Sequence, residues 1–525
     1  MRKPYQVWFP ILLVCFATVA ASAQSFRVQC PTSTITHPSS LHNNNTEPAY
    51  TAATTLSLNN QGFLAPTAHV NGAIKCQQIS GGDGYATMGD GTQTYMFSFG
   101  PLSGLADIAN GLPGTEPPNV FNTVYPGGKA NPLQPGDPAT SGLAGFTYNG
   151  AVGLVPDVDG NGGNGTATAA LTGHVDPRQI MDVGVMNGNI PAPLMAIDED
   201  DEFFLTLTNV GMIMRPDLFE QHTVHFHGYP NASAFYDGVP DASVAINIGA
   251  SFTYYYLAPD AGTYFWHCHI TPPEHLQMGM VGQLYVRPRQ DRVSASTSLY
   301  AALQTQQGDL RTKCDSNSDI LCSNPLPAVN TGAMGGSMYA YNDGDGSTQY
   351  DVEYPLQIHG FDPNFHFVGM TFNPEGFSDM KDKYFLLNGR SYPDTVTPGP
   401  LQTTSADGAS HFSQPLPSII NIPAGKKALL RISDLDVTEY QTLASLGIPM
   451  KVIAINAKLL RDQSGNNLYY NTNSITLAGG ESIDVILDAT GYTTGQVFYL
   501  YTPNLDHLSN DAENFGGLMT EVRIN

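Results

Sequence analysis

The sequence predicts an all-β protein made of two Greek-key β-sandwich domains with long insertions rich in glycine, proline and asparagine. Short segments that alternate apolar and polar residues recur along the chain between turn residues, which is the pattern of half-buried strands. Patterns typical of helices are almost absent. With 525 residues the chain is too long for one ordinary hydrophobic core, so two sandwiches are favoured over one.

The N-terminus has the features of an export signal. Arg2 and Lys3 precede an apolar run over residues 7–20, and Ala-Ser-Ala at 21–23 forms a small-x-small cleavage site. We therefore assign residues 1–23 to a signal peptide and expect a secreted or periplasmic protein. No later stretch is apolar over the ~18 residues that a membrane helix needs, so no membrane span is expected.

The cysteine count predicts one free thiol. Five cysteines remain after the signal: Cys30, Cys76, Cys268, Cys314 and Cys322. An odd number in an oxidising compartment requires one special thiol, and Cys268 stands between two histidines. Cys314 and Cys322 enclose a short loop and predict a local disulfide, which leaves Cys30 to pair with Cys76.

The charge balance is strongly acidic, with 46 Asp and Glu against 22 Lys and Arg and a net charge of -24. Such a surface repels nucleic acid and anionic lipid, so neither is expected as a partner. It can attract a cation or a basic redox protein, and it also serves the solubility of an exported protein.

Composition shifts suggest the boundaries of the parts. Residues 24–75 read as an irregular N-terminal segment, 76–288 as a first domain with a surface insertion at 101–190, 289–350 as a linker, and 351–525 as a second domain.

The predicted strands follow from alternating segments. Those of the first domain are 93–100, 202–211, 251–257, 262–269 and 281–286, and those of the second are 384–387, 427–432, 450–456, 482–487, 497–501 and 518–524. The linker contains one short predicted helix, at 298–307.

An acidic loop in the first insertion leaves two interpretations open. The run Asp157-Val-Asp159-Gly-Asn161-Gly162 matches the first half of a calcium-binding loop. Its twelfth position is Thr168 and not the bidentate glutamate of such loops. A plain Gly-Asn turn is the alternative.

One set of residues between 222 and 280 has the chemistry of a blue (type 1) copper centre. A cysteine thiolate, two imidazoles and a thioether, supplied by Cys268, His222, His275 and Met280, form that ligand set. A sandwich can supply one histidine from an early strand and the other ligands from the loop joining its last two strands. Met278 is an alternative axial ligand, which we assign to packing because Met280 completes the pattern His-x-x-x-Gly-Met.

The other histidines of this stretch form alternating pairs, His225 with His227 and His267 with His269. Residues i and i+2 of a strand project to the same face, so each pair can direct two nitrogens at one metal cluster. Because His267 and His269 flank Cys268, an electron that reaches the thiolate can pass through the backbone to that cluster. A simple electron carrier has no use for such wiring.

These motifs resemble the plastocyanin-like domain of multicopper oxidases. The resemblance lies in His-x-x-His-x-His-Gly at 222–228, Asp237-Gly-Val-Pro, Ser251-Phe-Thr-Tyr and Gly-Thr-Tyr-Phe-Trp-His-Cys-His-Ile at 262–270, and more weakly in the second half, at LLRISDLD, Leu446-Gly-Ile-Pro-Met and Gly517-Leu-Met-Thr-Glu-Val. It covers residues 190–290 and 350–525, and it implies cupredoxin-like domains.

The resemblance also implies roles for residues. His222, Cys268, His275 and Met280 would hold type 1 copper, His225 a type 2 copper, and His227, His267 and His269 a type 3 pair. Asp237 would be the acid that helps dioxygen reduction. The implied protein is an exported copper oxidase that takes single electrons from a metal ion or phenol-like reductant, or from a redox protein, and that assembles as a homo-oligomer, a trimer.

One departure from the family concerns the second domain, which has no His-x-His pair. Its histidines are His359, His366, His411 and His507. His507 is the best candidate for an extra cluster ligand, beside the plain interpretation of a surface histidine. The four imidazoles of the first domain are fewer than a full cluster needs, so the sequence leaves the completeness of the cluster open.

Two other functions remain. One is a non-catalytic blue-copper electron-transfer or copper-binding protein. The other is a copper nitrite reductase, which is less favoured because such enzymes have an acid where His225 stands and no second histidine where His269 stands.

Overall fold

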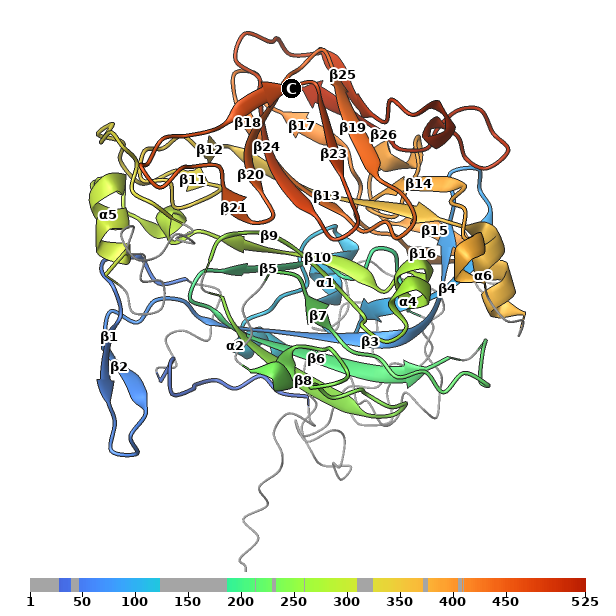
Figure 1. Cartoon of the computed structure of the whole chain (residues 1–525), viewed down its shortest axis with the longest axis horizontal. Coiled ribbons are helices and arrows are strands. Elements are labelled where there is room, and N and C mark those ends of the chain that lie inside the picture. The colour runs from blue at the N-terminus through green and yellow to red at the C-terminus, as the bar shows by residue number, and fades with distance from the viewer. Residues whose placement is uncertain are drawn as a thin grey trace, which may run out of the picture.

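The structure is a computed structural model that describes residues 28–38, 47–122, 187–212, 214–228, 233–258, 260–308, 324–371, 376–404, 408 and 410–525. Two β-sandwiches stack on each other, with the C-terminal one uppermost in Figure 1. In the described residues no helix is long and apolar enough to cross a membrane.

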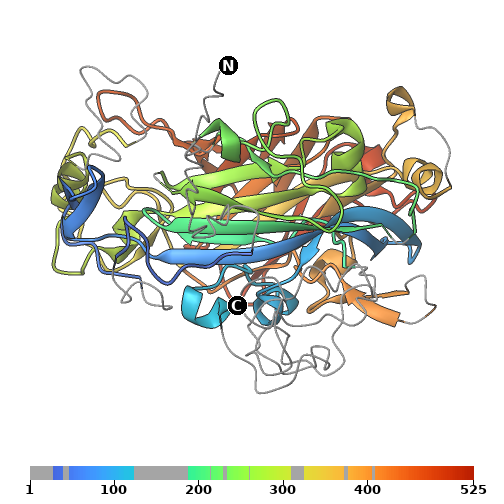
Figure 2. The same ribbon diagram turned by 90° about the horizontal axis from the view of Figure 1, so that it is seen from below.

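The first sandwich consists of two four-stranded sheets. One has the order β4 (Gln93–Pro101), β3 (Ile74–Thr87), β6 (Glu202–Gly211), β8 (Ser251–Leu257), and the other β5 (Met195–Asp198), β10 (Val281–Arg287), β9 (Gly262–His267), β7 (His225–Phe226). Seen from below in Figure 2, the strands of the first sheet run side by side along the long axis of the molecule. Buried side chains from both sheets, among them Phe97, Leu205, Tyr254, Trp266 and Leu284, form the core between them.

The second sandwich repeats this topology. One sheet has the order β14 (Tyr384–Leu387), β13 (Val352–Phe361), β18 (Lys427–Asp434), β24 (Ser482–Asp488), β20 (Met450–Ile455), β21 (Lys458–Leu459), with β22 (Tyr470–Thr472) also on β20; the other has β17 (Ile420–Ile422), β26 (Met519–Ile524), β25 (Val497–Tyr501), β19 (Gln441–Leu446), β23 (Ser474–Leu477). In both sandwiches one pair of strands in each sheet is parallel: β3 with β6 and β5 with β10 in the first, β13 with β18 and β17 with β26 in the second. Because parallel neighbours need crossover connections, the chain passes between the two sheets of each sandwich.

Short elements surround the sheets. They are the hairpins β1 (Thr55–Leu58) with β2 (Leu64–Ala68), β11 (Met338–Tyr339) with β12 (Gln349–Tyr350) and β15 (Leu401–Thr404) with β16 (Ser410–Ser413); the helices α1 (Leu105–Ala109), α2 (Pro118–Phe121), α4 (Pro272–Met278), α5 (Leu299–Gln306) and α6 (Pro363–Met370); and the 3-10 turns η3 (Ala234–Tyr236), η4 (Arg289–Arg292), η5 (Phe377–Asp379), η6 (Asp394–Val396) and η7 (Leu505–Leu508).

Buried polar side chains fasten the two sandwiches to each other. Gln283 of β10 donates through Nε2 to the Arg431 carbonyl at 3.0 Å and to the Ser433 hydroxyl at 2.8 Å. Thr263 of β9 donates to Asp484 Oδ1 at 2.6 Å. Because unpaired buried polar atoms cost about 1–3 kcal/mol each, these bonds favour one relative placement of the sandwiches.

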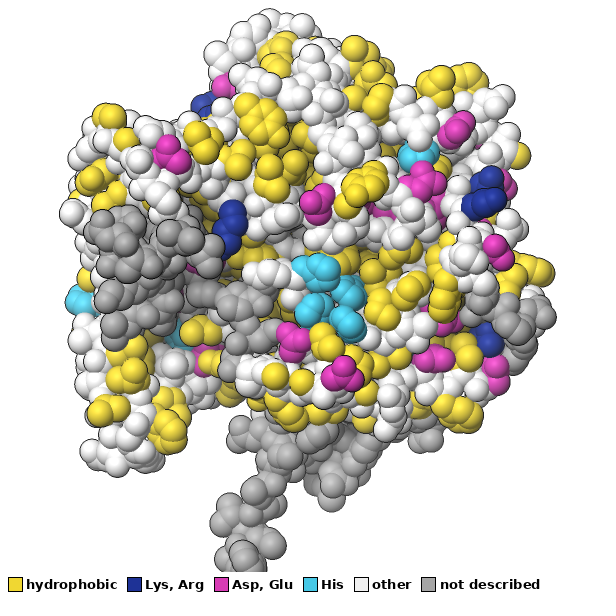
Figure 3. All heavy atoms as spheres, in the orientation of Figure 1, with side chains coloured by type: hydrophobic (Ala, Val, Ile, Leu, Met, Phe, Trp, Pro, Cys, Tyr) yellow, Lys and Arg dark blue, Asp and Glu magenta, His cyan; other side chains and the backbone are white. Residues whose placement is uncertain are grey.

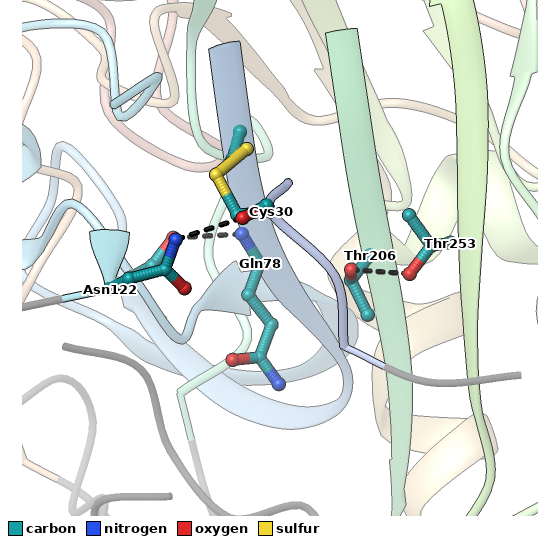
Figure 4. The surroundings of a disulfide bond; sticks show 7 residues. Cys30, Gln78, Asn122, Thr206 and Thr253 are labelled. Carbon is teal, nitrogen blue, oxygen red and sulfur yellow. Dashed lines mark hydrogen bonds between the residues drawn. A yellow bond between two sulfur atoms is a disulfide. The ribbon is translucent and has the colours of Figure 1, made fainter. Parts of the chain in front are cut away.

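A disulfide attaches the N-terminal segment to the first sandwich. Cys30 and Cys76 are bonded, with their Cα atoms 5.7 Å apart, and this confirms the predicted pairing. Figure 4 shows Asn122 donating through Nδ2 to the Cys30 carbonyl, at 2.8 Å. The same view shows the paired hydroxyls of Thr206 and Thr253, 2.8 Å apart, which join β6 to β8.

Several predicted elements are confirmed. Strands predicted at 202–211, 251–257, 384–387 and 497–501 coincide with β6, β8, β14 and β25, and α5 lies within the predicted helix at 298–307. The signal peptide, the Asp157–Gly162 loop and the Cys314–Cys322 pair lie outside the described residues.

Two expectations about irregular regions were wrong. The segment 24–75 contains the hairpin β1–β2, and β3 begins at its end. The described ends of the insertion 101–190 are not at the surface, since Leu102 and Phe121 are fully buried and Glu116 bridges to Cys76 of β3. These ends cover the edge of the first sandwich because their apolar residues complete its core.

Replacing Cys30 and Cys76 together by serine is expected to lower the free energy of unfolding by about 2–4 kcal/mol, because the bond closes a loop between residues 46 positions apart. Thermal unfolding of the metal-free protein measures the change. Cys268→Ser, which removes a thiol without opening a loop, is the control and should lower the melting temperature less. Equal melting temperatures for the double variant and the parent would contradict the prediction.

Candidate metal centre

Three buried side chains meet at the end of β9. Cys268 directly follows β9, His222 lies on a bridge to Ile246 ahead of β7, and His275 is part of α4. The Cys268 Sγ atom is 3.3 Å from Nδ1 of His275 and 4.0 Å from Nδ1 of His222. An ion with bonds of about 2.0–2.3 Å to nitrogen and sulfur holds such atoms roughly 3.3–4 Å apart. The three atoms can therefore ligate one ion.

The fourth predicted ligand, Met280, is brought to this group by local backbone structure. Prolines at the first two positions start α4, and Gly279, with φ of 118°, ends it in a left-handed turn. The chain then returns, so that the Met280 N–H donates to the His275 carbonyl at 2.8 Å and its own carbonyl accepts from the Cys268 N–H at 3.1 Å. Met280 and Met278 are both fully buried.

The surroundings of this group shift the pKa values of its two imidazoles in opposite directions. Burial and the neighbouring His275 hold the pKa of His222 well below its ordinary value, so its imidazole is neutral. Burial also lowers the pKa of His275, but Cys268 and Glu220 outweigh it and raise that pKa to about 9. Nε2 of His275 faces Oε2 of Glu220 at 3.6 Å, so a carboxylate lies on the far side of this ring from the thiol.

A second group of histidines lies on β7 and at the end of β9. The two strands pair with His225 opposite His267, and Nε2 of His227 is 3.0 Å from Nε2 of His267. His225 donates through Nδ1 to the Asp237 carbonyl at 2.7 Å, and His267 donates through Nδ1 to the Cys268 carbonyl at 2.6 Å. These bonds place the ring protons on Nδ1 and leave the Nε2 lone pairs of both rings for a metal.

His269 completes the second group. Its ring centroid is 5.2 Å from that of His225 and 5.5 Å from that of His267. In Figure 3 a cluster of histidine side chains occupies the depression between the two sandwiches. The structure thus brings together all four histidines that the sequence predicted for a metal cluster.

Two imidazoles of this second group, those of His227 and His267, are in the form that binds metal. Burial, followed by the neighbouring histidines, lowers the pKa of His227 to about 4. Burial lowers the pKa of His267 to about 3 in spite of its bond to the Cys268 carbonyl. Both rings are neutral at physiological pH, and imidazole suits copper as well as zinc, iron and nickel.

Asp237 lies beside this group. It follows η3, and its carboxylate Oδ2 is 3.6 Å from Nδ1 of His225, with 30% of the side chain exposed. It therefore both orients His225, through its main-chain carbonyl, and places an acid between the histidines and solvent.

The second sandwich closes over the histidines. A groove of about 480 Å³ is lined by His227 and His267 on one side and by residues of the second sandwich, including Asp436 and Glu439, on the other. A Cβ atom added to Gly480 would be 3.0 Å from Nδ1 of His227, which shows how closely the backbone approaches. The groove lining contains no further imidazole.

Strand register explains why the second sandwich supplies no ligands. Ala444 of β19 pairs with Tyr501 of β25 at the place where His225 pairs with His267 in the first sandwich. Counting from this pair, Gln441 stands at the position of His222. By the same count Thr502 stands at the position of Cys268. The second sandwich has the same framework without the ligands.

His507 is not the surface histidine that the sequence suggested. It is 4% exposed, and its Nδ1 and Nε2 are each 3.0 Å from a side-chain oxygen, of Gln441 and of Glu439. It lies in η7 between β25 and β26, as His275 lies in α4 between β9 and β10. It is not among the residues that line the groove, so it does not extend the metal group.

The remaining histidines of the second domain are not brought to the metal group either. His359 and His366 are buried and contact main-chain carbonyls of α4. The side chain of His411 lies outside the described part of the chain. These contacts to α4, like that of Glu220 to His275, join residues far apart in sequence and carry no local sequence signal.

Comparison with known proteins supports the copper interpretation. Residues 170–291 match the family model described as multicopper oxidase. Laccase abr2 of Aspergillus fumigatus is 33% identical over 111 residues, which cover 21% of this chain and 17% of the laccase. A copper-containing nitrite reductase of Rhizobium meliloti is 34% identical over 109 residues, covering 20% of this chain and 26% of the reductase.

Among solved structures, the multicopper oxidase mgLAC aligns over 86% of each chain at 16% identity, with a TM-score of 0.47. The matched part of the chain spans about a sixth of the length of the curated laccases, 17% of each. The matched segment contains every residue of both metal groups. Residues 170–291 are therefore similar to multicopper oxidases, a family whose cofactor is copper.

Proposed function

We propose that the protein is an exported copper-dependent oxidase, which takes single electrons from a small reductant at one copper site and delivers them to dioxygen at another. The observation that carries the proposal is the place of Cys268. Its Sγ faces His222 and His275 in one group, while its two covalent neighbours belong to the other.

The first group would be the electron-entry site. His222, Cys268 and His275 would hold type 1 copper, with Met280 as the axial ligand, and copper there would supply one-electron exchange. Thr223 donates its N–H to the Cys268 Sγ at 3.4 Å, which stabilises the thiolate form. Since the group is fully buried, the chain also excludes water from it.

The second group would hold the copper that meets dioxygen. The family assigns His225 to type 2 copper and His227, His267 and His269 to the type 3 pair. The Nε2 atoms of His227 and His267, 3.0 Å apart, are suited to sharing one ion. Asp237 would hold and pass a proton at Oδ2 beside His225, because its carboxylate is partly open to solvent.

The chain offers two routes between the groups. One is covalent, from Cys268 into the backbone of His267 or His269. The other is the hydrogen bond of 2.6 Å from His267 Nδ1 to the Cys268 carbonyl. Both are short, so no further residue is needed as a relay.

The partly exposed carboxylate beside His275 suggests the class of reductant. Glu220 lies 3.6 Å from Nε2 of this ring. Its hydrogen bond with His275 lowers the pKa of Glu220, so the carboxylate is ionised at neutral pH. An anion beside the entry site, on a chain with a net charge of -24, favours a metal cation or a basic donor over a neutral phenol.

The alternative is a blue-copper electron-transfer protein, and one observation favours it. The second sandwich contributes carboxylates but no imidazole to the groove over the histidines. A trimer is proposed from the family resemblance. A second copy of this chain would add no imidazole to the cluster either. The positions of its second sandwich that correspond to the four histidines are Ala444, Leu446, Tyr501 and Pro503.

Cys268→Ser is expected to abolish the intense visible band of the copper-loaded protein, because that band arises from the thiolate. Met280→Leu should shift the band and raise the reduction potential, since it removes the axial thioether. Met278→Leu, equally buried, is the matched control and should leave both unchanged. Absorption spectra and redox titration measure these effects. A colourless, fully copper-loaded parent protein would contradict the type 1 assignment.

His227→Ala and His267→Ala are each expected to reduce oxygen consumption by at least about a hundredfold while the blue band survives, since dioxygen reduction needs the second metal group. Steady-state oxygen uptake with Fe(II), Mn(II), Cu(I) and a phenolic dye measures this. His37→Asn, at a buried histidine outside both groups, is the control. One copper per chain, with no turnover by any donor, would instead support the electron-transfer function.

Acid should weaken the metal-free fold. The folded pKa values of His227 and His267, about 4 and about 3, lie below the ordinary value near 6.5. Between these values the unfolded chain binds more protons than the folded one, so stability falls as pH drops from about 6.5 to about 4. Denaturant unfolding at several pH values should show a shallower fall for His267→Gln. An identical pH dependence in parent and variant would refute this cause.

A further inference from the structure

The helix that carries His275 ends against the second sandwich. The carbonyl oxygens in the last turn of a helix lack partners within the helix. In α4 the Leu276 carbonyl accepts from His359 Nε2 at 3.0 Å. His359 belongs to β13 and is 1% exposed, and its bond adds to the one that the Leu276 carbonyl accepts from the Gly279 N–H at 3.0 Å.

The next residue of α4, Gln277, makes three contacts of the same kind. Its Nε2 donates to Asp382 Oδ1 at 2.9 Å, and its Oε1 accepts from the Asp362 N–H at 3.0 Å. Its main-chain carbonyl is 3.0 Å from Nε2 of His366, whose Nδ1 is 2.7 Å from the Tyr95 carbonyl. A neutral imidazole has one N–H, so His366 donates to one of these carbonyls at a time.

The partners of Gln277 are themselves held in place. Asp382 contacts Thr438, and Asp436 accepts from Gln441 Nε2 at 2.6 Å and from Thr438 at 3.0 Å. Gln441 in turn contacts His507 at 3.0 Å. This chain of polar groups ends in Gln441 and His507, which stand in the second sandwich where His222 and His275 stand in the first. A continuous series of hydrogen bonds therefore connects Gln441 and His507 to the ligand loop of the first sandwich.

We propose that His359, Asp362 and Asp382 of the second sandwich are positioning residues for the type 1 copper ligands, acting through Leu276 and Gln277 of α4. The proposal rests on the proposed function of the first group as a type 1 site. Leu276 and Gln277 directly follow the ligand His275, so a shift of α4 moves its imidazole relative to Cys268. Type 1 copper depends on a fixed ligand geometry, which partners beyond the ligands maintain.

A second buried glutamine provides a matched control. Gln283 of β10 is fully buried, as Gln277 is, and it also donates to the second sandwich, at the Arg431 carbonyl and the Ser433 hydroxyl. It lies on a strand, outside the ligand loop between Cys268 and Met280. Gln277→Met and Gln283→Met thus remove equivalent contacts between the sandwiches, but only the first lies next to a ligand.

The experiment compares these two variants by two measurements. In the metal-free protein, amide hydrogen exchange over residues 274–280 should become at least about tenfold faster in Gln277→Met, which removes two buried hydrogen bonds, and stay unchanged in Gln283→Met. In the copper-loaded protein, the visible band and the reduction potential should shift in Gln277→Met alone. His359→Phe, which keeps a buried ring but removes the donor, should act like Gln277→Met.

The two measurements separate failure of the proposal from failure of the proposed function. Equal exchange rates and equal spectra for Gln277→Met and Gln283→Met would overturn the positioning role. A copper-loaded parent protein without the blue band would refute the type 1 site, and with it any role in positioning its ligands. If Gln277→Met does not fold, His359→Phe against Gln283→Met decides between the same outcomes.

Discussion

The antiparallel pairing of β7 with β9 is the constraint on which both metal groups depend. It places His225 opposite His267 and ends at Cys268, where the strand passes into the ligand loop. Successive side chains of an extended chain point to opposite faces. Cys268 therefore turns into the buried side, toward His222 and His275, while His267 turns to the groove and His269 lies beside it. Cys268 thus connects the two candidate metal groups through its position in this register. A slip of the pairing by one residue would turn Cys268 and its neighbouring histidines to the opposite faces.

The second sandwich keeps this framework without its chemistry. At the register position of His225 and His267 it has Ala444 and Tyr501, which offer no imidazole for the copper that we propose for the first sandwich. Its residues instead close the groove, with Gly480 close against His227, and hold the end of α4 through His359. The second sandwich thus supports α4 and forms one side of the groove, although it has no ligands of its own. The buried bonds from Gln283 to its backbone fix it for both tasks.

Local patterns identified the residues that the structure brings together in the two candidate metal groups, because the spacing of histidine, cysteine and methionine within a single stretch is typical of a copper loop. They also found strands with one solvated face, such as β25. They missed β3, which is buried on both faces and contains Gly81, Gly82 and Gly84, and β13, which contains Pro355 and Gly360, since such residues are typical of turns. The burial of His507 and the contact of His359 with α4 could not be predicted, because each depends on strands paired across the whole second sandwich.

The groove determines what chemistry the second metal group can perform. Two of the four imidazoles, His227 and His267, line it, and their Nε2 atoms, 3.0 Å apart, are suited to one shared ion. The opposite wall offers Asp436 and Glu439. Carboxylates are harder ligands than imidazole, and they also hold and release protons. In this protein the wall would therefore serve dioxygen reduction through proton supply beside Asp237. The number of ions bound would depend on the first sandwich alone, because each further ion needs imidazoles that the second sandwich has replaced.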